Sequence, residues 1–421
     1  MCSSWPPTTG TSVNPRRTVV TGLGVRTPAG NSPKELWDVL LTGVSTARRI
    51  VSFDTTALPV DFACEIHDFD PLVRLDPKTA RRTDRTTQLA ACAAADALED
   101  AGGPAPPPER CAVIVGTGFG GLHTLESALT HCDDLGHGRI RALHIPMLMP
   151  NAASAVISMC HSFTGPTMTV STSCASGGHA VGEGLRLLRD GSVDLALAGG
   201  TEANITANSI LGFYRCGALS RRTSDPHTAS RPFDLDRDGF VLGEAAAFLV
   251  LESMDGAIRR GARIYAELAG FGNNSDAYHL VAPRPGGQSA LQCMQKALGD
   301  ARLSVDDVVH INAHGTSTPL NDLCEAQAIA GLLNGRTVPV TATKSITGHT
   351  IGAAGALEAA VVALSLHHRT IPPTANLHAQ DPDCEIDVVT RPRELAEGAA
   401  ISNSFGFGGH NAVLVFTPPP S

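Results

Sequence analysis

One cysteine in this sequence lies where its thiol could act as a nucleophile. Cys174 is in STSCASG, at a turn between an expected strand at 167–172 and an expected helix that reaches residue 188. A thiol at a helix N-terminus faces unpaired backbone N–H groups and the positive end of the helix dipole. Both features predict a lowered pKa and a more reactive thiolate. The alternative is a buried structural cysteine, because free cysteine is among the most buried residue types.

Three loops in the second half of the chain carry further groups suited to catalysis. His314 is in NAHGTSTPLND, directly after an expected strand, and His349 is in KSITGHTIGAAG, directly before an expected helix. Phe407 is flanked by glycines in NSFGFGGHN. A single histidine is more often structural than catalytic. Two histidines at loop boundaries, each beside glycine and threonine, favour a catalytic role.

Strands and alanine-rich helices alternate along the chain, and the alternation starts again near residue 260. Expected strands lie at 18–22, 111–115, 193–200 and 243–252, then at 264–268, 308–313 and 339–343. Expected helices include 33–41, 78–98 and 288–301. The pattern predicts two similar α/β halves, at 17–260 and 261–417, after a disordered tail at 1–16 that is rich in Ser, Thr and Pro.

The expected helix at 78–98 begins with a basic stripe. Lys78, Arg81, Arg82 and Arg85 are spaced so that they share one helical face. The stripe is either a solvated face or a docking site for an acidic partner. The rest of the helix is alanine-rich, which suits a tightly packed interior.

A second motif, GTGFGG at 116–121, matches the dinucleotide fingerprint GxGxxG. No partner strand ending in an acidic residue follows at the expected distance, so close backbone packing is the preferred interpretation. A nucleotide-dependent enzyme remains the remote alternative.

Composition excludes several classes of protein. The net charge of −9 argues against a general nucleic-acid binder, and no apolar run looks long enough to span a membrane. The 11 cysteines are irregularly spaced without CxxC or metal-like spacing, which predicts reduced thiols in the cytoplasm and no metal centre.

STSCASG, NAHGTSTPLND, KSITGHTIGAAG and SNSFGFGGHN, in this order and spacing, resemble the elongating β-ketoacyl-[acyl-carrier-protein] synthases. The resemblance covers roughly residues 16 to 417. It implies an α/β, thiolase-like fold with five layers, α-β-α-β-α, from two duplicated halves. It also implies a dimer whose central sheets continue across the interface.

The resemblance implies a decarboxylative condensation. Cys174 would take an acyl group from the phosphopantetheine of an acyl carrier protein, with no bound cofactor. Backbone N–H groups of Cys174 and Phe407 would form the oxyanion hole. His314 and His349, as neutral imidazoles, would stabilise the enolate that forms when malonyl-carrier protein loses carbon dioxide. Lys344 would pair with Glu325 and so orient the histidine loops.

Further roles carry over from the family motifs. Thr316 and Thr318 resemble residues that bind the pantetheine amides, and Phe407 resembles a gate for the acyl chain. A second mobile loop would include Asp276 and His279, and Phe213 either lines the acyl tunnel or is core packing. The expected docking residues for the carrier protein are Lys78, Arg81, Arg82, Arg139 and Arg141. A monovalent-cation site, known in some members, would involve Asn312, Glu358, Ser402 and Asn403.

Single residues separate this chain from neighbouring subfamilies. His349 stands where initiating synthases have asparagine, GFGGHN lacks the second cysteine of thiolases, and Cys174 distinguishes the chain from inactive chain-length factors. Phe119 lies where many fatty-acid members have a smaller residue at the bottom of the acyl tunnel. A phenylalanine there should shorten the tunnel, and rejection of each extra methylene of the acyl chain is worth about 1–3 kcal/mol. If Phe119 does not instead rotate away or pack across a dimer, short or unsaturated chains are favoured.

We therefore expect the ketosynthase α subunit of a type II polyketide system, as a homodimer or paired with a chain-length factor. Fatty-acid elongation is the alternative.

Overall fold

The two halves of the chain repeat one strand order. The computed structural model describes residues 16–103, 106–135 and 142–419. Residues 1–15, most of the expected tail, lie outside that description. In the first half the strands lie in the order β5-β4-β6-β7-β1, and in the second half in the corresponding order β10-β9-β14-β15-β8. The parallel and antiparallel relations repeat as well.

The strands of the first half are β1 (Thr18–Arg26), β4 (Cys111–Gly116), β5 (Thr167–Val170), β6 (Leu195–Glu202) and β7 (Ala245–Ser253). Those of the second half are β8 (Ala266–Ser275), β9 (Val308–Asn312), β10 (Pro339–Thr341), β14 (Ala399–Gly406) and β15 (His410–Thr417). Short strands are β2 (Arg48–Arg49), β3 (Phe62–Ala63), β11 (Thr370–Ile371), β12 (Asp387–Val388) and β13 (Arg393–Glu394). Because β1 pairs with β8, and β12 extends the far edge, these elements form one 11-stranded sheet in the described part of the chain.

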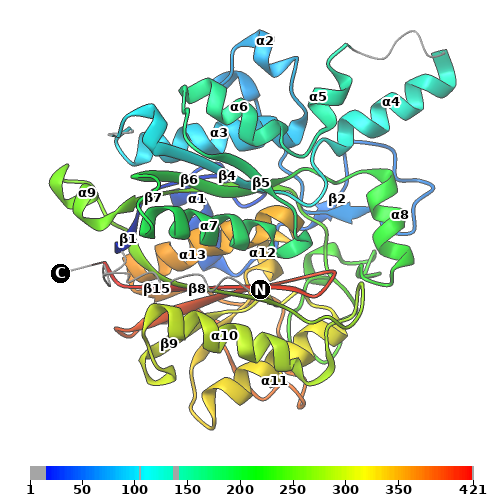
Figure 1. Cartoon of the computed structure of the whole chain (residues 1–421). Coiled ribbons are helices and arrows are strands. Elements are labelled where there is room, and N and C mark those ends of the chain that lie inside the picture. The colour runs from blue at the N-terminus through cyan, green and yellow to red at the C-terminus, as the bar shows by residue number, and fades with distance from the viewer. Residues whose placement is uncertain (1–15, 104–105, 136–141, 420–421) are drawn as a thin grey trace, which may run out of the picture.

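Helices cover both halves of this sheet and also fill the space between them (Figure 1). The outer layer of the first half contains α3 (Arg85–Asp100) and α6 (Ala152–His161). The central layer contains α7 (Ser176–Arg189) and α13 (Ala354–His368), which pack against each other. The outer layer of the second half contains α10 (Gln288–Ala301) and α11 (Pro319–Leu333). The five-layer, thiolase-like α/β fold is confirmed.

The remaining helices lie at the ends and edges of these layers. They are α1 (Pro33–Thr42), α2 (Pro77–Ala80), α4 (Leu122–Leu135), α5 (His144–Leu148), α8 (Ala207–Arg215), α9 (Met254–Arg259) and α12 (Lys344–Thr347). We propose a boundary between the halves near residue 260, between α9 and β8.

Three strands of the first half are buried along their whole length. Every residue of β1, β4 and β6 is buried. Helices on both faces remove the solvent-exposed side that an alternating pattern requires, so these strands are continuous apolar or small-residue runs.

The prediction of a single helix at 78–98 is wrong, because the helix is interrupted between α2 and α3. Asp84 is the N-cap of α3 and accepts a hydrogen bond from Thr86 N, and Thr83 Oγ1 donates to Thr79 O at 2.9 Å. The break turns Arg85 inward, where it pairs with Glu244. Arg85 therefore does not share the exposed basic face.

The prediction that no apolar run is long enough to span a membrane is also wrong, because one helix has sufficient length and apolar composition. Ile351–His368 has 18 residues with a mean hydropathy of 1.3, but 89% of it is buried inside the protein. Its apolar side chains contact the two halves of the sheet, so it is the core helix of the central layer.

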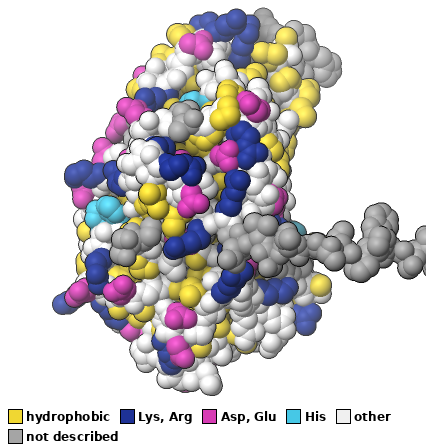
Figure 2. All heavy atoms as spheres, turned by 60° about the vertical axis from the view of Figure 1, so that its left-hand side comes forward, with side chains coloured by type: hydrophobic (Ala, Val, Ile, Leu, Met, Phe, Trp, Pro, Cys, Tyr) yellow, Lys and Arg dark blue, Asp and Glu magenta, His cyan; other side chains and the backbone are white. Residues whose placement is uncertain are grey.

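The face on the left of Figure 1 carries a mixed distribution of charge. Figure 2 shows Lys and Arg side chains interspersed with Asp and Glu on that face. Acidic side chains lie between the basic ones, so this face forms no continuous basic surface.

Close contact between α3 and β1 gives a test of the fold. An added Cβ at Gly24 would lie 2.0 Å from Ala93 O and 2.5 Å from Ala97 N, both backbone atoms that cannot rotate away. We expect Gly24→Ala to lower the free energy of unfolding by about 1–3 kcal/mol in urea denaturation.

The control is Gly299→Ala, in the exposed interior of α10, where an added Cβ meets nothing within 4 Å. It should be neutral or stabilise by up to about 1 kcal/mol. Equal losses in the two variants would contradict the packing argument.

Candidate active site

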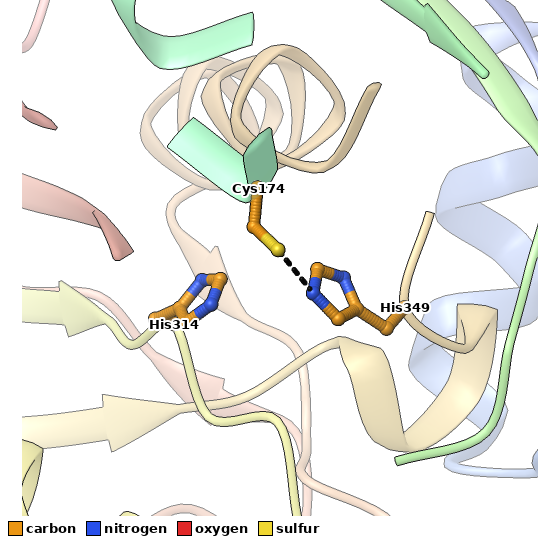
Figure 3. Close-up of side chains that lie close together, drawn as sticks. All are labelled: Cys174, His314 and His349. Atoms are coloured by element: carbon orange, nitrogen blue, oxygen red, sulfur yellow. Dashed lines mark hydrogen bonds between the residues drawn. The ribbon is translucent and has the colours of Figure 1, made fainter. Parts of the chain in front are cut away.

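Three segments from different parts of the chain bring Cys174, His314 and His349 together (Figure 3). Cys174 lies in a single helical turn, Ser173–Ala175, just before α7. His314 follows β9, and His349 lies between α12 and α13. Cys174 Sγ is 3.0 Å from His349 Nε2, and the ligand atoms of all three side chains lie within 4.8 Å of one another. The sequence analysis predicted this convergence from separate motifs.

The turn around Cys174 is held in an unusual backbone conformation. Ser173 has a φ of 52°, in the left-handed region that few non-glycine residues adopt. Ser176 Oγ donates to Ser173 O at 2.6 Å, and Thr172 N donates to Ser176 Oγ at 2.9 Å. These bonds fix the turn that presents the thiol.

The glycine-rich loop after β14 approaches the same turn. An added Cβ at Gly406 would lie 2.6 Å from Thr172 O and 3.1 Å from Cys174 N, so only glycine allows this approach. The backbone N–H groups of Phe407 and Cys174 act on the thiol and lower its pKa. The half-buried Phe407 side chain packs in the same apolar cluster as Cys174.

The predicted lowering of the Cys174 pKa is wrong. Burial raises the pKa of the thiol to about 12, and the positive charge of Lys344 opposes this only in part. The α7 helix begins at Ser176, two residues after the cysteine, and the thiol is only 5% exposed. The sequence analysis considered the helix terminus but could not give the depth of burial.

Both histidines are neutral near pH 7. Burial and the nearby Lys344 charge lower the pKa values of His314 and His349 well below 6.5. Ile351 N donates to His349 Nδ1 at 3.3 Å, which leaves the ring proton on Nε2, facing the sulfur. The two rings meet edge to face, with centroids 5.4 Å apart.

The predicted pair of Lys344 and Glu325 is wrong. Lys344 Nζ contacts Glu358 Oε1 at 2.5 Å and donates to His314 O at 2.7 Å. Glu325 instead accepts hydrogen bonds from His314 N and Gly315 N, both at 2.8 Å. Lys344 and Glu325 thus hold the His314 segment from different sides. Glu358 is the one acidic residue of the apolar α13 helix, and a lone carboxylate in such a helix requires a partner.

These two glutamates beside the histidines have shifted pKa values. Burial raises the pKa of both Glu325 and Glu358 to about 7, although hydrogen bonds to Glu325 and the Lys344 charge on Glu358 act in the opposite direction.

A cavity of about 550 Å³ opens above the thiol and the imidazoles. Its lining contains most of the predicted residues, namely Cys174, Phe213, Asp276, His279, His314, Thr316, Thr318, Glu325, His349 and Phe407. Thr316 Oγ1 and Thr318 Oγ1 are 2.9 Å apart, so two hydroxyls face one region of the wall. The cavity therefore combines an apolar lining with a few polar groups near the thiol.

The loop that contains Asp276 and His279 is hydrogen-bonded to the loop that contains Phe407. Asp276 N donates to Gly409 O and Gly408 N donates to Leu280 O, both at 2.8 Å. Asn411 Nδ2 also donates to Asp276 Oδ1 at 2.8 Å. A displacement of either loop would therefore disturb the other.

Phe119 does not line the cavity. Its side chain is 42% exposed and meets Phe213 edge to face, with ring centroids 6.2 Å apart. Phe213 does line the cavity. Gly116 and Gly121 of the same motif pack against backbone, as predicted: an added Cβ at Gly116 would lie 2.4 Å from Ser176 O, and one at Gly121 would lie 2.2 Å from Met147 O. Gly118 instead packs against the side chain of Glu202.

The four residues of the expected cation site carry buried oxygens without a hydrogen-bond partner among the described residues. These atoms are Asn312 Oδ1, Glu358 Oε2, Ser402 Oγ and Asn403 Oδ1. Oxygen donors suit a hard monovalent or divalent cation, so the residues fit such an ion.

The basic residues of the predicted docking site are only partly described. Lys78, Arg81 and Arg82 are exposed on and after α2, and none of them lines the cavity. Arg139 and Arg141 lie outside the described residues.

The sequence analysis missed two aromatic residues beside the histidines. Phe240 lies 5.1 Å from His349 and Phe405 lies 5.9 Å from His314, centroid to centroid. Phe405 is two residues from Phe407 in the same motif, so the motif could have indicated it. Phe240 gives no local signal, because only the fold brings it to the site.

The pKa of Cys174 can be tested by alkylation with iodoacetamide. Below a pKa of about 12 the thiolate fraction rises tenfold with each pH unit, so the rate should rise about tenfold per unit between about pH 6.5 and about pH 9. Cys174→Ala gives the background from other thiols. A rate that levels off below about pH 8 would show that the helix terminus and Lys344 outweigh burial.

Family comparisons cover nearly the whole chain. Residues 16–257 match the model "Beta-ketoacyl synthase, N-terminal domain", and residues 265–378 match "Beta-ketoacyl synthase, C-terminal domain". The chain is 42% identical over 406 residues to 3-oxoacyl-[acyl-carrier-protein] synthase 2 of Synechocystis sp., which covers 95% of this chain and 98% of that protein.

Two solved structures have the same fold. One is described as the ishigamide ketosynthase/chain length factor, with a TM-score of 0.91, 36% identity, and coverage of 96% of this chain and 100% of that one. The other, AntDE:AntF, is described as a type II PKS acyl-carrier protein in complex with its ketosynthase bound to the hexaketide. Its TM-score is 0.89 at 30% identity, with coverage of 96% and 100%. Together with the cysteine and the two neutral imidazoles in one cavity, these matches place the chain in the β-ketoacyl synthase family, as a β-ketoacyl-[acyl-carrier-protein] synthase of the acyltransferase class.

Proposed function

We propose that Cys174 is the acyl-accepting nucleophile of this synthase. The observation that carries the proposal is the 3.0 Å contact between Cys174 Sγ and His349 Nε2 inside the cavity. The sulfur attacks the thioester carbonyl of an acyl-carrier protein. The new carbon–sulfur bond replaces the bond to phosphopantetheine, whose thiol leaves with the proton of Cys174.

Negative charge on the thioester oxygen is stabilised by backbone donors. The N–H groups of Cys174 and Phe407 both form hydrogen bonds with the sulfur. They therefore lie close to the position where the thioester oxygen would develop its charge. Because Phe407 belongs to a glycine-rich loop tied to the Asp276 loop, we assign the two loops to one gate for the acyl chain.

The second half-reaction uses both imidazoles as hydrogen-bond donors. Malonyl-carrier protein loses carbon dioxide, and the electron pair of the broken carbon–carbon bond stays on the thioester fragment as an enolate. The enolate oxygen lies between His314 and His349. The enolate carbon attacks the acyl-Cys174 carbonyl, a carbon–carbon bond forms, and the cysteine sulfur leaves. Neutral rings suit this role because each can donate N–H without a prior protonation step.

Several groups support this chemistry from outside the reaction. Lys344 and Glu325 position the His314 segment, and Thr316 and Thr318 offer hydroxyls to the pantetheine amides. A cation at Asn312, Glu358, Ser402 and Asn403 would neutralise buried oxygen charge behind the site.

We infer that the pathway is a type II polyketide system in the cytoplasm. One of the structural relatives is described as a type II PKS complex and the other as a ketosynthase/chain length factor, which supports this assignment. The alternative, fatty-acid elongation, is supported by the 42% identity to a 3-oxoacyl-[acyl-carrier-protein] synthase 2. Phe119, in contact with the wall residue Phe213, favours short or unsaturated chains.

We also infer a dimer, with a second copy or with a chain-length factor. The strand β5 lies at one edge of the sheet, and an unpaired edge strand invites pairing with another chain. Met168 in this strand, Met159 in α6 and Ile145 in α5 are exposed, as is Phe119. Exposed apolar side chains near an edge strand are typical of an assembly surface.

Intact-protein mass spectrometry tests the nucleophile. Mixing the protein with acyl-carrier proteins of graded chain length should give an acyl adduct that Cys174→Ala abolishes. The control is Cys216→Ala, which removes another thiol of the same cavity and should keep the adduct. Short primers should load faster than long saturated ones. An adduct that persists in Cys174→Ala would contradict the assignment of the nucleophile.

Charge reversal tests the docking face. Arg81→Glu combined with Arg82→Glu should raise the apparent KM for the acyl-carrier protein about tenfold at low salt, because carrier proteins are acidic. The KM for a free acyl-pantetheine thioester should not change. Arg259→Glu, on α9, is the exposed control. An unchanged carrier-protein KM would place docking elsewhere.

A further inference from the structure

One buried carboxylate near the site has no part in the chemistry described above. Glu202 ends β6 and is 0% exposed. No Lys or Arg among the described residues forms an ion pair with it. Burial raises its pKa to about 7, against the effect of its hydrogen bonds. A buried carboxylate without a cation needs several hydrogen-bond donors.

The donors to Glu202 come from two separate segments. From the GTGFGG segment, Gly118 N donates at 2.6 Å, Phe119 N at 3.2 Å and Thr117 Oγ1 at 3.1 Å. From the segment after His349, Gly352 N donates at 3.1 Å. Each carboxylate oxygen accepts two bonds, so Glu202 fastens both segments to the end of β6.

The first segment contacts one wall of the cavity from outside. It carries Phe119, whose ring meets Phe213 edge to face. Phe213 in turn meets Phe240 at 5.3 Å, and Phe240 meets His349 at 5.1 Å, centroid to centroid. An aromatic chain therefore runs from the Phe119 segment to the catalytic imidazole.

The second segment orients that imidazole through the backbone. Ile351, which donates to His349 Nδ1, has a φ of 45°, a strained conformation for a β-branched residue. Its neighbour Gly352 is held by Glu202. The two segments also touch, because an added Cβ at Gly352 would lie 2.5 Å from Gly118 N.

We propose that Glu202 is a positioning residue that couples the Phe119 segment to the Ile351 turn, so that primer length and the orientation of His349 are set together. The proposal rests on the proposed function, since it assigns the source of chain-length selection in the same site. Removal of the carboxylate should therefore alter two properties at once, namely the preference for short primers and the rate of acyl transfer.

Glu202→Gln is the decisive variant. In one orientation its NH₂ group faces the N–H groups of Gly118 and Gly352, and two of the four hydrogen bonds are lost. In the other it faces the N–H group of Phe119 and the Thr117 hydroxyl, which can accept a hydrogen bond, so one is lost, with little change in side-chain shape. We expect the rate of acyl transfer from a carrier protein that bears a short acyl chain to fall about tenfold. The ratio of short-primer to long-primer loading should fall by a similar factor.

The matched control is Glu252→Gln, another buried glutamate, which pairs with Arg260 far along the same sheet from the site. It should lower thermal stability without changing the loading ratio. If Glu202→Gln does not fold, Thr117→Val removes one donor and should shift both readouts in the same direction, by a smaller factor.

The possible outcomes separate this proposal from the proposed function. If Phe119→Ala changes the loading ratio but the Glu202 variant leaves either the ratio or the rate unchanged, the coupling is wrong and the condensing role of the site stands. If the unaltered protein forms no adduct with any primer, the proposed function fails first. A matched change of both readouts in Glu202→Gln, absent in Glu252→Gln, supports the coupling.

Discussion

The site depends on direct backbone contact between the two central helices. An added Cβ at Gly177, in α7, would lie 2.6 Å from Ala356 N, and one at Gly355, in α13, would lie 2.5 Å from Gly178 N. Glycine at these positions lets the first turns of the helices touch. Because Cys174 lies two residues before α7 and His349 lies five residues before α13, this contact brings the sulfur and the imidazole together. A side chain between the helices would separate the reacting groups before any substrate arrived.

Burial then sets the charge state of the site. The low-dielectric interior keeps His314 and His349 neutral and raises the pKa of Cys174, and the same burial requires a partner for every fixed charge. Lys344 meets this requirement by bonding to Glu358 and to the carbonyl of His314. The ammonium therefore joins the framework of the histidine segment to the central helix. The arrangement favours hydrogen-bond donation over proton storage, as expected where charge develops on an oxygen of the substrate.

The sequence predicted the parts of the site that lie within local motifs. Cys174, His314, His349 and Phe407 each stand in a short glycine-bearing segment, and the repeated alternation of strands and helices indicated the two halves. It did not predict contacts that depend on distant packing. The partner of Lys344 lies one helix away, and the thiol pKa depends on burial from every side. The helix break before Arg85 had a local signal, because Asp84 is a good N-cap residue, but the alanine-rich run that follows obscured it.

The sheet order also places the first and last long strands on either side of a common neighbour. β1 and β15 both pair with β8, and Arg17 and Thr417 both reach Glu267 in that strand. The two ends of the described chain therefore lie close together, at the seam between the repeated halves. The architecture is consequently suited to circular permutation. A short linker could join these ends, and new ends could be opened between α9 and β8 without altering any strand pairing. In such a protein the half that supplies the histidines would be synthesised before the half that supplies the cysteine.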